Sequence, residues 1–390
     1  MALAVKRDKR RKHMNTFSYF LPVNLFFGRG ESDRIGEITG RYGRHALLVT
    51  GRSSARKSGL TDRILKQLDA AGLAVTLFEE VTANPLTTTV FKGRDLAREA
   101  GCDVIIAAGG GSIMDCAKGI AFAMKNDGDI EDYIFGRRQG TGAVPLIAVP
   151  TTCGTGSEGN HFAVLTNPET NDKKSLISDS VTPAASIIDS SLMETMPQRV
   201  IAAVGFDALC HNMESYTSRR SQPLSDMMCE YAIRLIAGSF LKVYQGEGSA
   251  KDWDAMALAS TLGGMAMHVA GLIAPHGMEH PLSGMKNITH GEGLAPLEPV
   301  VIARNAATCP EKYAFISRCF GGTDEKDCAD RMTDLIRKLE LPLRLRDLGF
   351  EEGDVAWLTE NCMKVSAGNI GNNPAALTKA DVEAIYKAAL

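Results

Sequence analysis

The sequence lacks the features that mark several large classes of protein. No apolar run approaches the ~18–20 residues that a membrane-spanning helix requires, so we expect no membrane protein. The nine cysteines are scattered singly without a CxxC pair, which indicates reduced thiols in a cytoplasmic protein rather than a disulfide framework. A formal net charge of −3 provides no basic surface for nucleic acid. The chain also contains no internal repeat and no low-complexity tract.

What remains is the composition of an ordinary globular chain. Hydrophobic residues make up 44% and charged residues 23% of the 390 positions, which argues against a disordered or fibrous protein. A single core rarely grows beyond ~250–300 residues, so this length predicts two domains. Residues 1–13 stand apart as a basic run with no apolar segment after it. We interpret them as a disordered leader, and a basic arm for an anionic surface is the alternative.

Short apolar runs alternate with helical periods through the first half of the chain. The expected strands are 46–50, 74–78, 104–108 and 144–149, and the expected helices between them include 61–71 and 113–124. Such spacing requires crossover connections and predicts a parallel, doubly wound sheet. Beyond residue 197, long helical patterns replace the strands, as at 201–216 and 255–270. We therefore expect an α/β domain over residues 14–196 and an all-α domain over 197–390.

Two glycine-rich junctions follow expected strands. Gly109-Gly110-Gly111-Ser112 leads from a strand into a helix, where small residues and free backbone N–H groups can approach a phosphate. On periodicity alone, a structural turn is as good an explanation. The second junction, 150–158, is rich in small residues and hydroxyls and favours a ligand across the strand ends. Gly28-Arg29-Gly30 is a false lead, because Asp33 stands where the dinucleotide fingerprint GxGxxG has its third glycine.

Four of the eight histidines form a spaced cluster in the second half. Asp207 and His211 are four residues apart in a helical pattern, as are His276 and His280, and His290 follows in a glycine-rich turn. A single pair at this spacing is usually a helix-surface contact. One carboxylate and three imidazoles together suit a first-row divalent ion such as iron, zinc or manganese.

These motifs, in this order, resemble the iron-containing (group III) alcohol dehydrogenases, the family of lactaldehyde reductases, butanol dehydrogenases and 1,3-propanediol dehydrogenases. The resemblance runs from about Thr16 to Leu390. Its signatures are Gly109-Gly-Gly-Ser-Ile-Met-Asp115, Pro150-Thr-Thr-Cys-Gly-Thr-Gly-Ser-Glu158, Gly205-Phe-Asp-Ala-Leu-Cys-His211-Asn-Met-Glu214, His276-Gly-Met-Glu-His280-Pro-Leu282, His290-Gly291, and Asn373-Pro374 followed by Thr378 and Asp381.

The resemblance implies a fold and an activity. The fold would be a Rossmann-like α/β domain followed by an all-α domain, the architecture that dehydroquinate synthase-like proteins share. The activity would be hydride transfer between a nicotinamide cofactor and a small primary alcohol or aldehyde. A divalent metal would act as a Lewis acid, Fe²⁺ by family and otherwise Zn²⁺ or Mn²⁺. A homodimer or larger homo-oligomer is also implied.

The resemblance also implies roles for individual residues. The implied metal ligands are Asp207, His211, His276 and His290. His280 would lie close to the metal without binding it and would take part in proton transfer. The implied cofactor residues are Asn84, Gly110, Gly111, Ser112, Asp115, Thr151, Thr152, Thr155 and Lys174.

The cofactor preference follows from the end of the second expected strand. Relatives that prefer NAD tend to carry an aspartate there, which accepts hydrogen bonds from the ribose and repels a 2′-phosphate. This chain has Gly51, followed by Arg52, Ser53 and Ser54. A small residue leaves room, and guanidinium and hydroxyl groups bind phosphate oxygens. We therefore expect a preference for NADP(H), the alternative being that Gly51 only shapes a turn and both cofactors work.

The chain departs from the family pattern beside the expected cleft. Gly159-Asn160-His161-Phe162 stands where many members have Val-Thr, and we interpret His161 as a packing or substrate-contact residue rather than a catalytic one. Two other classes of function stay open. One is a metal- and NAD-dependent lyase of the dehydroquinate synthase type, which would need a basic cluster absent from 276–290 apart from Lys286. The other is a non-catalytic metal- or nucleotide-binding protein.

Overall fold

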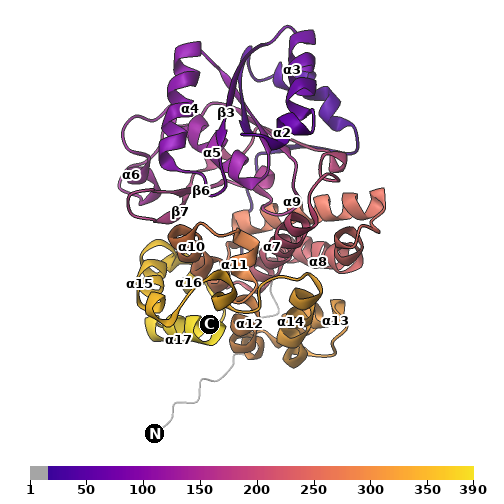
Figure 1. Cartoon of the computed structure of the whole chain (residues 1–390), viewed down its shortest axis with the longest axis vertical. Coiled ribbons are helices and arrows are strands. Elements are labelled where there is room, and N and C mark those ends of the chain that lie inside the picture. The colour runs from indigo at the N-terminus through magenta and orange to yellow at the C-terminus, as the bar shows by residue number, and fades with distance from the viewer. Residues whose placement is uncertain (1–15) are drawn as a thin grey trace.

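The computed structural model describes residues 16–390, so the proposed leader at 1–13 lies outside the described residues. The chain forms an α/β half and a helical half, which lie one above the other in Figure 1. The last strand ends at Ile188 and the first long helix of the second half begins at Gln198. We keep residue 196 as the proposed boundary between the two domains.

The α/β half contains a parallel sheet of six strands in the order β1-β8-β5-β4-β2-β3. The strands are β1 (Asn24–Phe27), β2 (His45–Gly51), β3 (Ala74–Val81), β4 (Val104–Gly109), β5 (Leu146–Pro150) and β8 (Ala185–Ile188). The helices of this half are α1 (Ile35–Thr39), α2 (Ser54–Lys57), α3 (Leu60–Ala70), α4 (Thr87–Ala100), α5 (Gly111–Ala123) and α6 (Ile130–Ile134). This confirms the expected strand–helix alternation and the doubly wound class.

The central strands are apolar on both faces because helices cover both faces. Leu47 and Val49 of β2 belong to the core that includes residues of α4 and α5. The alternate residues, Ala46 and Leu48, belong to the core that includes residues of α1 and α3. Side chains on a strand alternate between faces, so one uninterrupted apolar run supplies two cores at once.

The strand order places both glycine-rich junctions at one crevice. The chain leaves β2 toward β3 and returns through β4 to β5, so the topology reverses between β2 and β4. Gly51 ends β2, Gly109 ends β4, and Gly109 is paired with Pro150 at the end of β5. Ligands of open parallel sheets bind outside the carboxyl ends of strands at such a reversal.

A second, two-stranded antiparallel ribbon joins β6 (Phe162–Thr166) to β7 (Lys173–Ile177). Short 3₁₀ turns flank it: η2 (Ser157–Gly159) precedes β6, and η3 (Asp179–Val181) follows β7. In Figure 1 the ribbon lies on the side of the α/β half that faces α10. Lysines at the start of β7 therefore reach the helical half, as described below.

The helical half is built around α7 (Gln198–Thr217), α8 (Pro223–Tyr244) and α9 (Ala250–Ala270). The other helices are α10 (Ala274–Lys286), α11 (His290–Leu294), α12 (Glu298–Asn305), α13 (Pro310–Cys319), α14 (Cys328–Lys338), α15 (Val355–Val365), α16 (Ala367–Asn372) and α17 (Lys379–Ala389). The region around His290 is thus the start of a short helix rather than the turn we expected. Among the described helices, none alone is long and apolar enough to cross a membrane; α9 and α10 meet that criterion only as a pair bent by 104°.

Candidate active site

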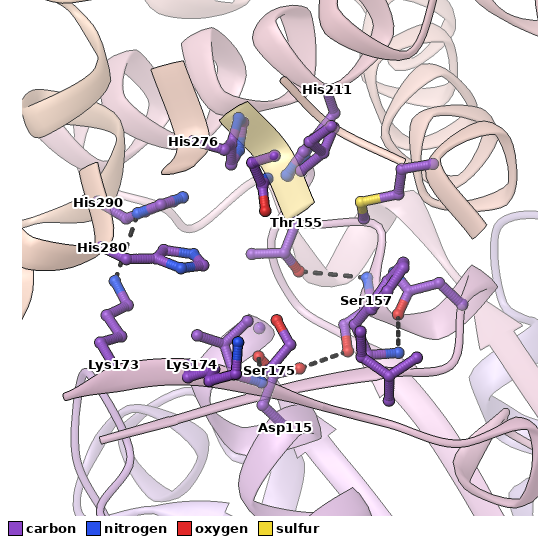
Figure 2. Close-up of a pocket in the computed structure, with 18 of the residues that line it drawn as sticks. Asp115, Thr155, Ser157, Lys173, Lys174, Ser175, His211, His276, His280 and His290 are labelled. Carbon is purple, nitrogen blue, oxygen red and sulfur yellow. Dashed lines mark hydrogen bonds between the residues drawn. The ribbon is translucent and has the colours of Figure 1, made fainter. Parts of the chain in front are cut away.

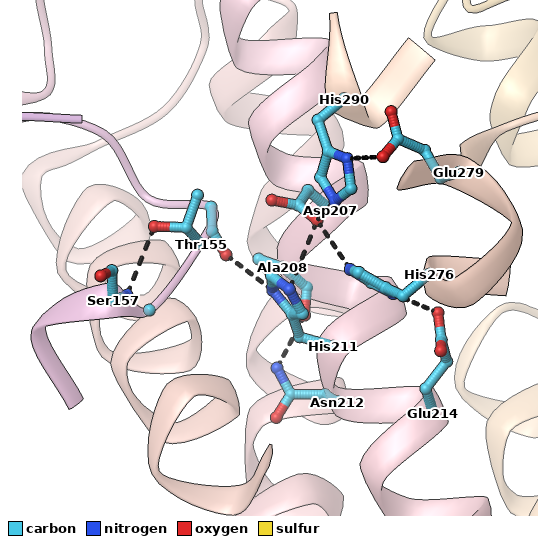
Figure 3. Close-up of polar contacts among 12 residues, drawn as sticks. Thr155, Ser157, Asp207, Ala208, His211, Asn212, Glu214, His276, Glu279 and His290 are labelled. Atoms are coloured by element: carbon cyan, nitrogen blue, oxygen red, sulfur yellow. Dashed lines mark hydrogen bonds and ion pairs between the residues drawn. The ribbon is translucent and has the colours of Figure 1, made fainter. Parts of the chain in front are cut away.

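Three imidazoles converge on one carboxylate oxygen at the top of the helical half. Asp207 and His211 lie one turn apart on α7, His276 lies on α10, and His290 is the first residue of α11 (Figure 3). The Asp207 Oδ1 atom is 3.3 Å from His276 Nε2, 3.5 Å from His211 Nε2 and 3.7 Å from His290 Nε2. Helices far apart in the sequence therefore bring all four predicted ligands together.

The outer nitrogen of each ring is held by an oxygen of the protein. His276 Nδ1 is 2.5 Å from Glu214 Oε1, His211 Nδ1 is 3.1 Å from the Gly154 carbonyl oxygen, and His290 Nδ1 pairs with Glu279 Oε2. A proton on each Nδ1 leaves the Nε2 lone pair directed toward Asp207. Carboxylates and carbonyls orient metal-binding histidines in this way.

The buried charges also fit a divalent cation. Asp207, Glu214 and Glu279 are almost fully buried, and within residues 16–390 the buried ammonium group beside them is that of Lys173, whose Nζ is 3.3 Å from Glu279 Oε2. Burial and the nearby Glu214 raise the pKa of Glu298 well above the usual value, which disfavours a further negative charge there. With neutral imidazoles this group carries two excess negative charges. Buried charge must be compensated, and M²⁺ would do so.

The pKa shifts in this group follow from burial and from each neighbour's charge. Burial would raise the pKa of Asp207, but His211, His290 and His276 outweigh it and hold that pKa well below its usual value. Burial lowers the pKa of His211 to about 4. For His276 the effect of burial is outweighed by Glu214 and Asp207, which raise its pKa to about 10. A cation at this place would compete with the His276 proton.

His280 lies one turn beyond His276 on α10 and faces a cavity of about 290 Å³. Its ring centre is 6.0 Å from that of His290, so it is a neighbour of the four predicted ligands. Burial, then the charge of Lys173, lowers the pKa of His280 well below the ordinary value, which makes the ring neutral. Figure 2 shows His211, His276, His280 and His290 facing Asp115, Lys174 and Ser175 across this cavity.

A second, larger cavity of about 740 Å³ runs from the end of β2 to the histidine cluster. It is lined by the residues predicted to bind the cofactor, Gly51, Arg52, Ser53, Ser54, Asn84, Gly110, Gly111, Ser112, Thr151, Thr152 and Thr155. The two remaining predictions, Asp115 and Lys174, line only the smaller cavity. The two cavities share Asn84, Gly111, Ser112, Thr155, Asp207 and His290. They therefore meet at the predicted metal ligands.

The glycines let the two junctions pack against each other. A side chain at Gly111 would clash with Thr155 of the second junction. Asp115, one turn later, accepts hydrogen bonds from Ser157 Oγ at 2.7 Å and from the Val164 backbone N–H at 3.0 Å. Burial raises its pKa, and Lys118, Ser157 and Val164 oppose that rise. Asp115 thus holds Ser157 and Val164 in place through hydrogen bonds, and it also lines the smaller cavity.

The chain matches two models of one protein family. The iron-containing alcohol dehydrogenase model matches residues 22–190, and the C-terminal model of the Fe-containing alcohol dehydrogenase family matches residues 201–390. The chain belongs to the iron-containing alcohol dehydrogenase family. A 1,3-propanediol dehydrogenase of Klebsiella pneumoniae is 36% identical over 96% of this chain and 98% of its own length.

Two further relatives of this family differ in the cofactor that their names give. An NADPH-dependent butanol dehydrogenase of Clostridium saccharobutylicum is 32% identical over 95% of this chain and 97% of its own length. The crystal structure of an NADH-dependent butanol dehydrogenase from Thermotoga maritima superposes with a TM-score of 0.90 at 28% identity, covering 97% of this chain and 99% of that one. Membership in the iron-containing alcohol dehydrogenase family makes the chain an alcohol/aldehyde oxidoreductase with a metal and a nicotinamide cofactor. The lyase and the non-catalytic alternatives are not favoured.

Sequence reasoning missed the carboxylates behind the histidines. Glu214 and Glu279 each come three residues after a predicted ligand, inside the two motifs that carried the resemblance. That spacing was the available signal, because a residue three positions along a helix lies on nearly the same face. It also missed Lys173, which binds Glu279 from the ribbon. His161, interpreted as a packing or substrate-contact residue, lies between Asn160 and Phe162, which both line the smaller cavity.

Proposed function

We propose that this chain transfers hydride between a nicotinamide cofactor in the larger cavity and a small primary alcohol or aldehyde in the smaller one. Asp207, His211, His276 and His290 would hold the divalent metal. The observation that supports this assignment is the convergence of three Nε2 atoms on Asp207 Oδ1 where the two cavities meet. Substrate oxygen and cofactor would then approach the same point from two sides.

A divalent ion at this position would act as a Lewis acid toward the substrate oxygen, and the nicotinamide would accept or supply the hydride. His280, neutral and facing the smaller cavity, would take the hydroxyl proton on a ring nitrogen during oxidation and return it during reduction. Phe162, Met267 and Leu272 line the same cavity and would pack against a short alkyl chain while excluding water. We therefore propose a small, largely apolar substrate.

For the nicotinamide cofactor, we propose a preference for NADP(H). Arg52, Ser53 and Ser54 line the far end of the larger cavity, next to Gly51. The other arginine that lines this cavity, Arg63, pairs with Asp33 at 2.7 Å, and Arg56 of α2 pairs with Glu79 at 2.7 Å. Within residues 16–390, no carboxylate pairs with Arg52. Its guanidinium is thus available for a 2′-phosphate.

We also propose the identity of the metal, the oligomeric state and the cellular location. Fe²⁺ is the proposed metal by family, although the ligand set also suits Zn²⁺ and Mn²⁺, and the Irving–Williams order favours zinc over iron at equal availability. A homodimer is proposed because β1 leaves one edge of the sheet open, with Leu25 and Phe27 exposed on it. A cytoplasmic location is proposed because all nine cysteines are free.

The proposal is tested with the full-length chain loaded with Fe²⁺ or Zn²⁺ and mixed with a series of short aldehydes. The near-ultraviolet absorbance of the reduced nicotinamide reports turnover with NADPH or NADH. We expect aldehyde-dependent oxidation of NADPH, with kcat/KM at least ~10-fold above that for NADH, a difference of ~1.4 kcal/mol. Turnover without added metal after chelation would contradict the metal assignment, and a clear NADH preference would contradict the cofactor assignment.

A further inference from the structure

A second group of ligand-type side chains lies away from the four predicted metal ligands. His161 Nδ1 is 2.8 Å from Asp179 Oδ1, and the rings of His161 and His268 lie 3.9 Å apart between centroids, tilted by 37°. One ligand atom from each of His161, Asp179 and His268 falls within 4.8 Å of the other two. The roles given above to the active site use none of these three residues.

These three side chains come from the two halves of the molecule. His161 directly precedes β6 and Asp179 begins η3 after β7, so both lie at the same end of the ribbon. The backbone fixes this end, because Phe162 is paired with Ile177 and the Ser178 N–H donates to the His161 carbonyl at 3.3 Å. His268 lies near the end of α9 in the helical half. The group therefore spans the ribbon and α9.

His268 has an unsatisfied polar atom in this group. Its side chain is buried, with 5% of its surface exposed. Within residues 16–390, its Nδ1 atom has no hydrogen-bond partner. A buried polar atom without a partner costs roughly 1–3 kcal/mol, so native structures rarely leave one without a reason. A cation at the in-plane edge of the two rings, beside Asp179, would give this nitrogen a partner.

The charges of the group suit a metal of moderate affinity. Burial lowers the pKa of His268 to about 4 and also lowers that of His161, so both rings are neutral near pH 7 and keep a free lone pair. Asp179, largely exposed, supplies one negative charge and can move toward an ion. Lys118 and Arg220 add positive charge nearby, which opposes binding. We expect weaker binding here than at the cluster around Asp207.

We propose that His161, Asp179 and His268 form a second metal site that binds a divalent cation of the zinc class and ties the β6–β7 ribbon to α9. Two imidazoles and one carboxylate favour Zn²⁺, Co²⁺ or Ni²⁺ over Ca²⁺ and Mg²⁺, which prefer oxygen ligands. Water reaches the exposed carboxylate and completes the coordination. This site is additional to the one in the proposed function and does not depend on it.

The position of this site connects it to substrate binding. Phe162 and Met267 are the sequence neighbours of His161 and His268, and Ile177 lies two residues before Asp179. All three line the smaller cavity. A cation on the outer side would fix these side chains against one another. Its removal should raise KM for the aldehyde while leaving KM for the nicotinamide cofactor within a factor of about 2.

The test uses the full chain, already loaded with metal at the first site, dialysed against micromolar ZnCl₂. Zinc or total metal per chain is then counted by mass spectrometry. We expect two ions per chain in the parent and in His45→Asn, a control histidine on β2 that binds Thr76. His161→Asn and His268→Asn should hold one ion. Asp179→Asn should raise the dissociation constant of the second ion at least ~10-fold.

Two results would overturn this proposal. One is a parent protein that binds no more ions than His161→Asn at every zinc concentration up to ~100 times the protein, and the other is a second ion that persists in both histidine variants. If the buried His268→Asn variant does not fold, Asp179→Asn supplies the test, because the Asp179 side chain is 64% exposed. An unchanged zinc titration in Asp179→Asn and His161→Asn would equally exclude the site.

Discussion

His276 and His280 lie one helical turn apart on α10, and their substitution should have different consequences. His276→Asn removes a nitrogen from the convergent group on Asp207, so metal and turnover should be lost together. His280→Asn leaves that group intact. We expect metal to stay bound while kcat falls about 10²-fold or more, the usual loss when a general acid–base group is removed. Metal per chain and kcat, measured on the same samples, separate the two roles.

His45→Asn serves as the control for both variants, because His45 lies at the start of β2 and lines neither cavity. Its metal content and kcat should match the parent. Loss of metal from His280→Asn would show that this histidine is a ligand and that the proposed ligand set is wrong.

Gly51 offers a test of cofactor preference that does not disturb the backbone. A Cβ at Gly51 would lie 3.4 Å from Ile113 Cδ1 and 3.7 Å from Ser54 Oγ, so an aspartate side chain can be accommodated. Its charge would repel a 2′-phosphate and accept hydrogen bonds from an unphosphorylated ribose. We expect Gly51→Asp to lower kcat/KM for NADPH about 10²-fold, which corresponds to ~3 kcal/mol of charge repulsion near the surface.

Steady-state kinetics with both cofactors check this expectation, and thermal melting confirms that the variant is folded. Arg52→Gln is the matched variant. It should lower kcat/KM for NADPH by a smaller factor and leave kcat/KM for NADH unchanged. If Gly51→Asp lowers kcat/KM equally for both cofactors, Gly51 shapes a turn and does not select the ribose.

Ligand residues could be predicted from the sequence where a motif places them, whereas their supports could not. Asp207, His211 and His276 stood out because rare side chains recur at helical spacing. Glu214 and Glu279 occur in the same motifs, but an isolated glutamate in a helix is usually exposed. Only the packing of α7 against α10 and α11 shows that both are buried beside an imidazole. Long-range neighbours such as Lys173 leave no local signal.

At the scale of elements, long apolar segments were predictable and the small ribbon was not. Strands β2, β4 and β5 are continuous apolar runs, because helices cover both faces of the sheet. Strand β7 begins with Lys173, Lys174 and Ser175, which do not favour a strand, and only two apolar residues follow them. The ribbon forms because its partner strand and the loop before it are held by tertiary contacts.

The strongest of these contacts is the buried Lys118 of α5. Its Nζ donates to the Ser157 carbonyl at 2.7 Å, Ser157 Oγ at 2.8 Å and the Phe162 carbonyl at 2.8 Å, and it lies 3.0 Å from two oxygens of Asn160. Lys118→Met would remove this donor from all five oxygens, of which Asn160 Oδ1 still accepts a hydrogen bond from the Phe162 backbone N–H. We expect a loss of about 3–5 kcal/mol in the free energy of unfolding, measured by urea denaturation.

Lys125→Met is the control, because Lys125 lies just after the same helix and is exposed. It should change the free energy of unfolding by less than ~0.5 kcal/mol. A similarly small change for Lys118→Met would mean that the loop 157–162 is held by its own backbone contacts. The position of Ser157, and through it of Asp115, would then not depend on α5.

At the scale of the whole molecule, the cleft between the two halves is complete within one chain. The residues that line both cavities come from the α/β half and the helical half of the same chain. Oligomer formation is therefore not needed to complete the active site. The open edge at β1 can form a subunit interface without contributing to that site. Dissociation into monomers should then leave the active site intact.

This separation gives a prediction about assembly. Leu25 and Phe27 lie on one face of the edge strand β1 with 38% and 40% of their surfaces exposed, which is unusual for apolar side chains beside unpaired backbone groups. We expect light scattering to give twice the chain mass for the parent and the chain mass itself for Leu25→Lys/Phe27→Lys, with kcat within about 3-fold because the cleft is untouched. Leu343→Lys, at a leucine of similar exposure (42%) in the helical half, should stay dimeric. A double variant that remains dimeric would place the interface elsewhere. A parent that is monomeric at micromolar concentration would contradict the proposed dimer.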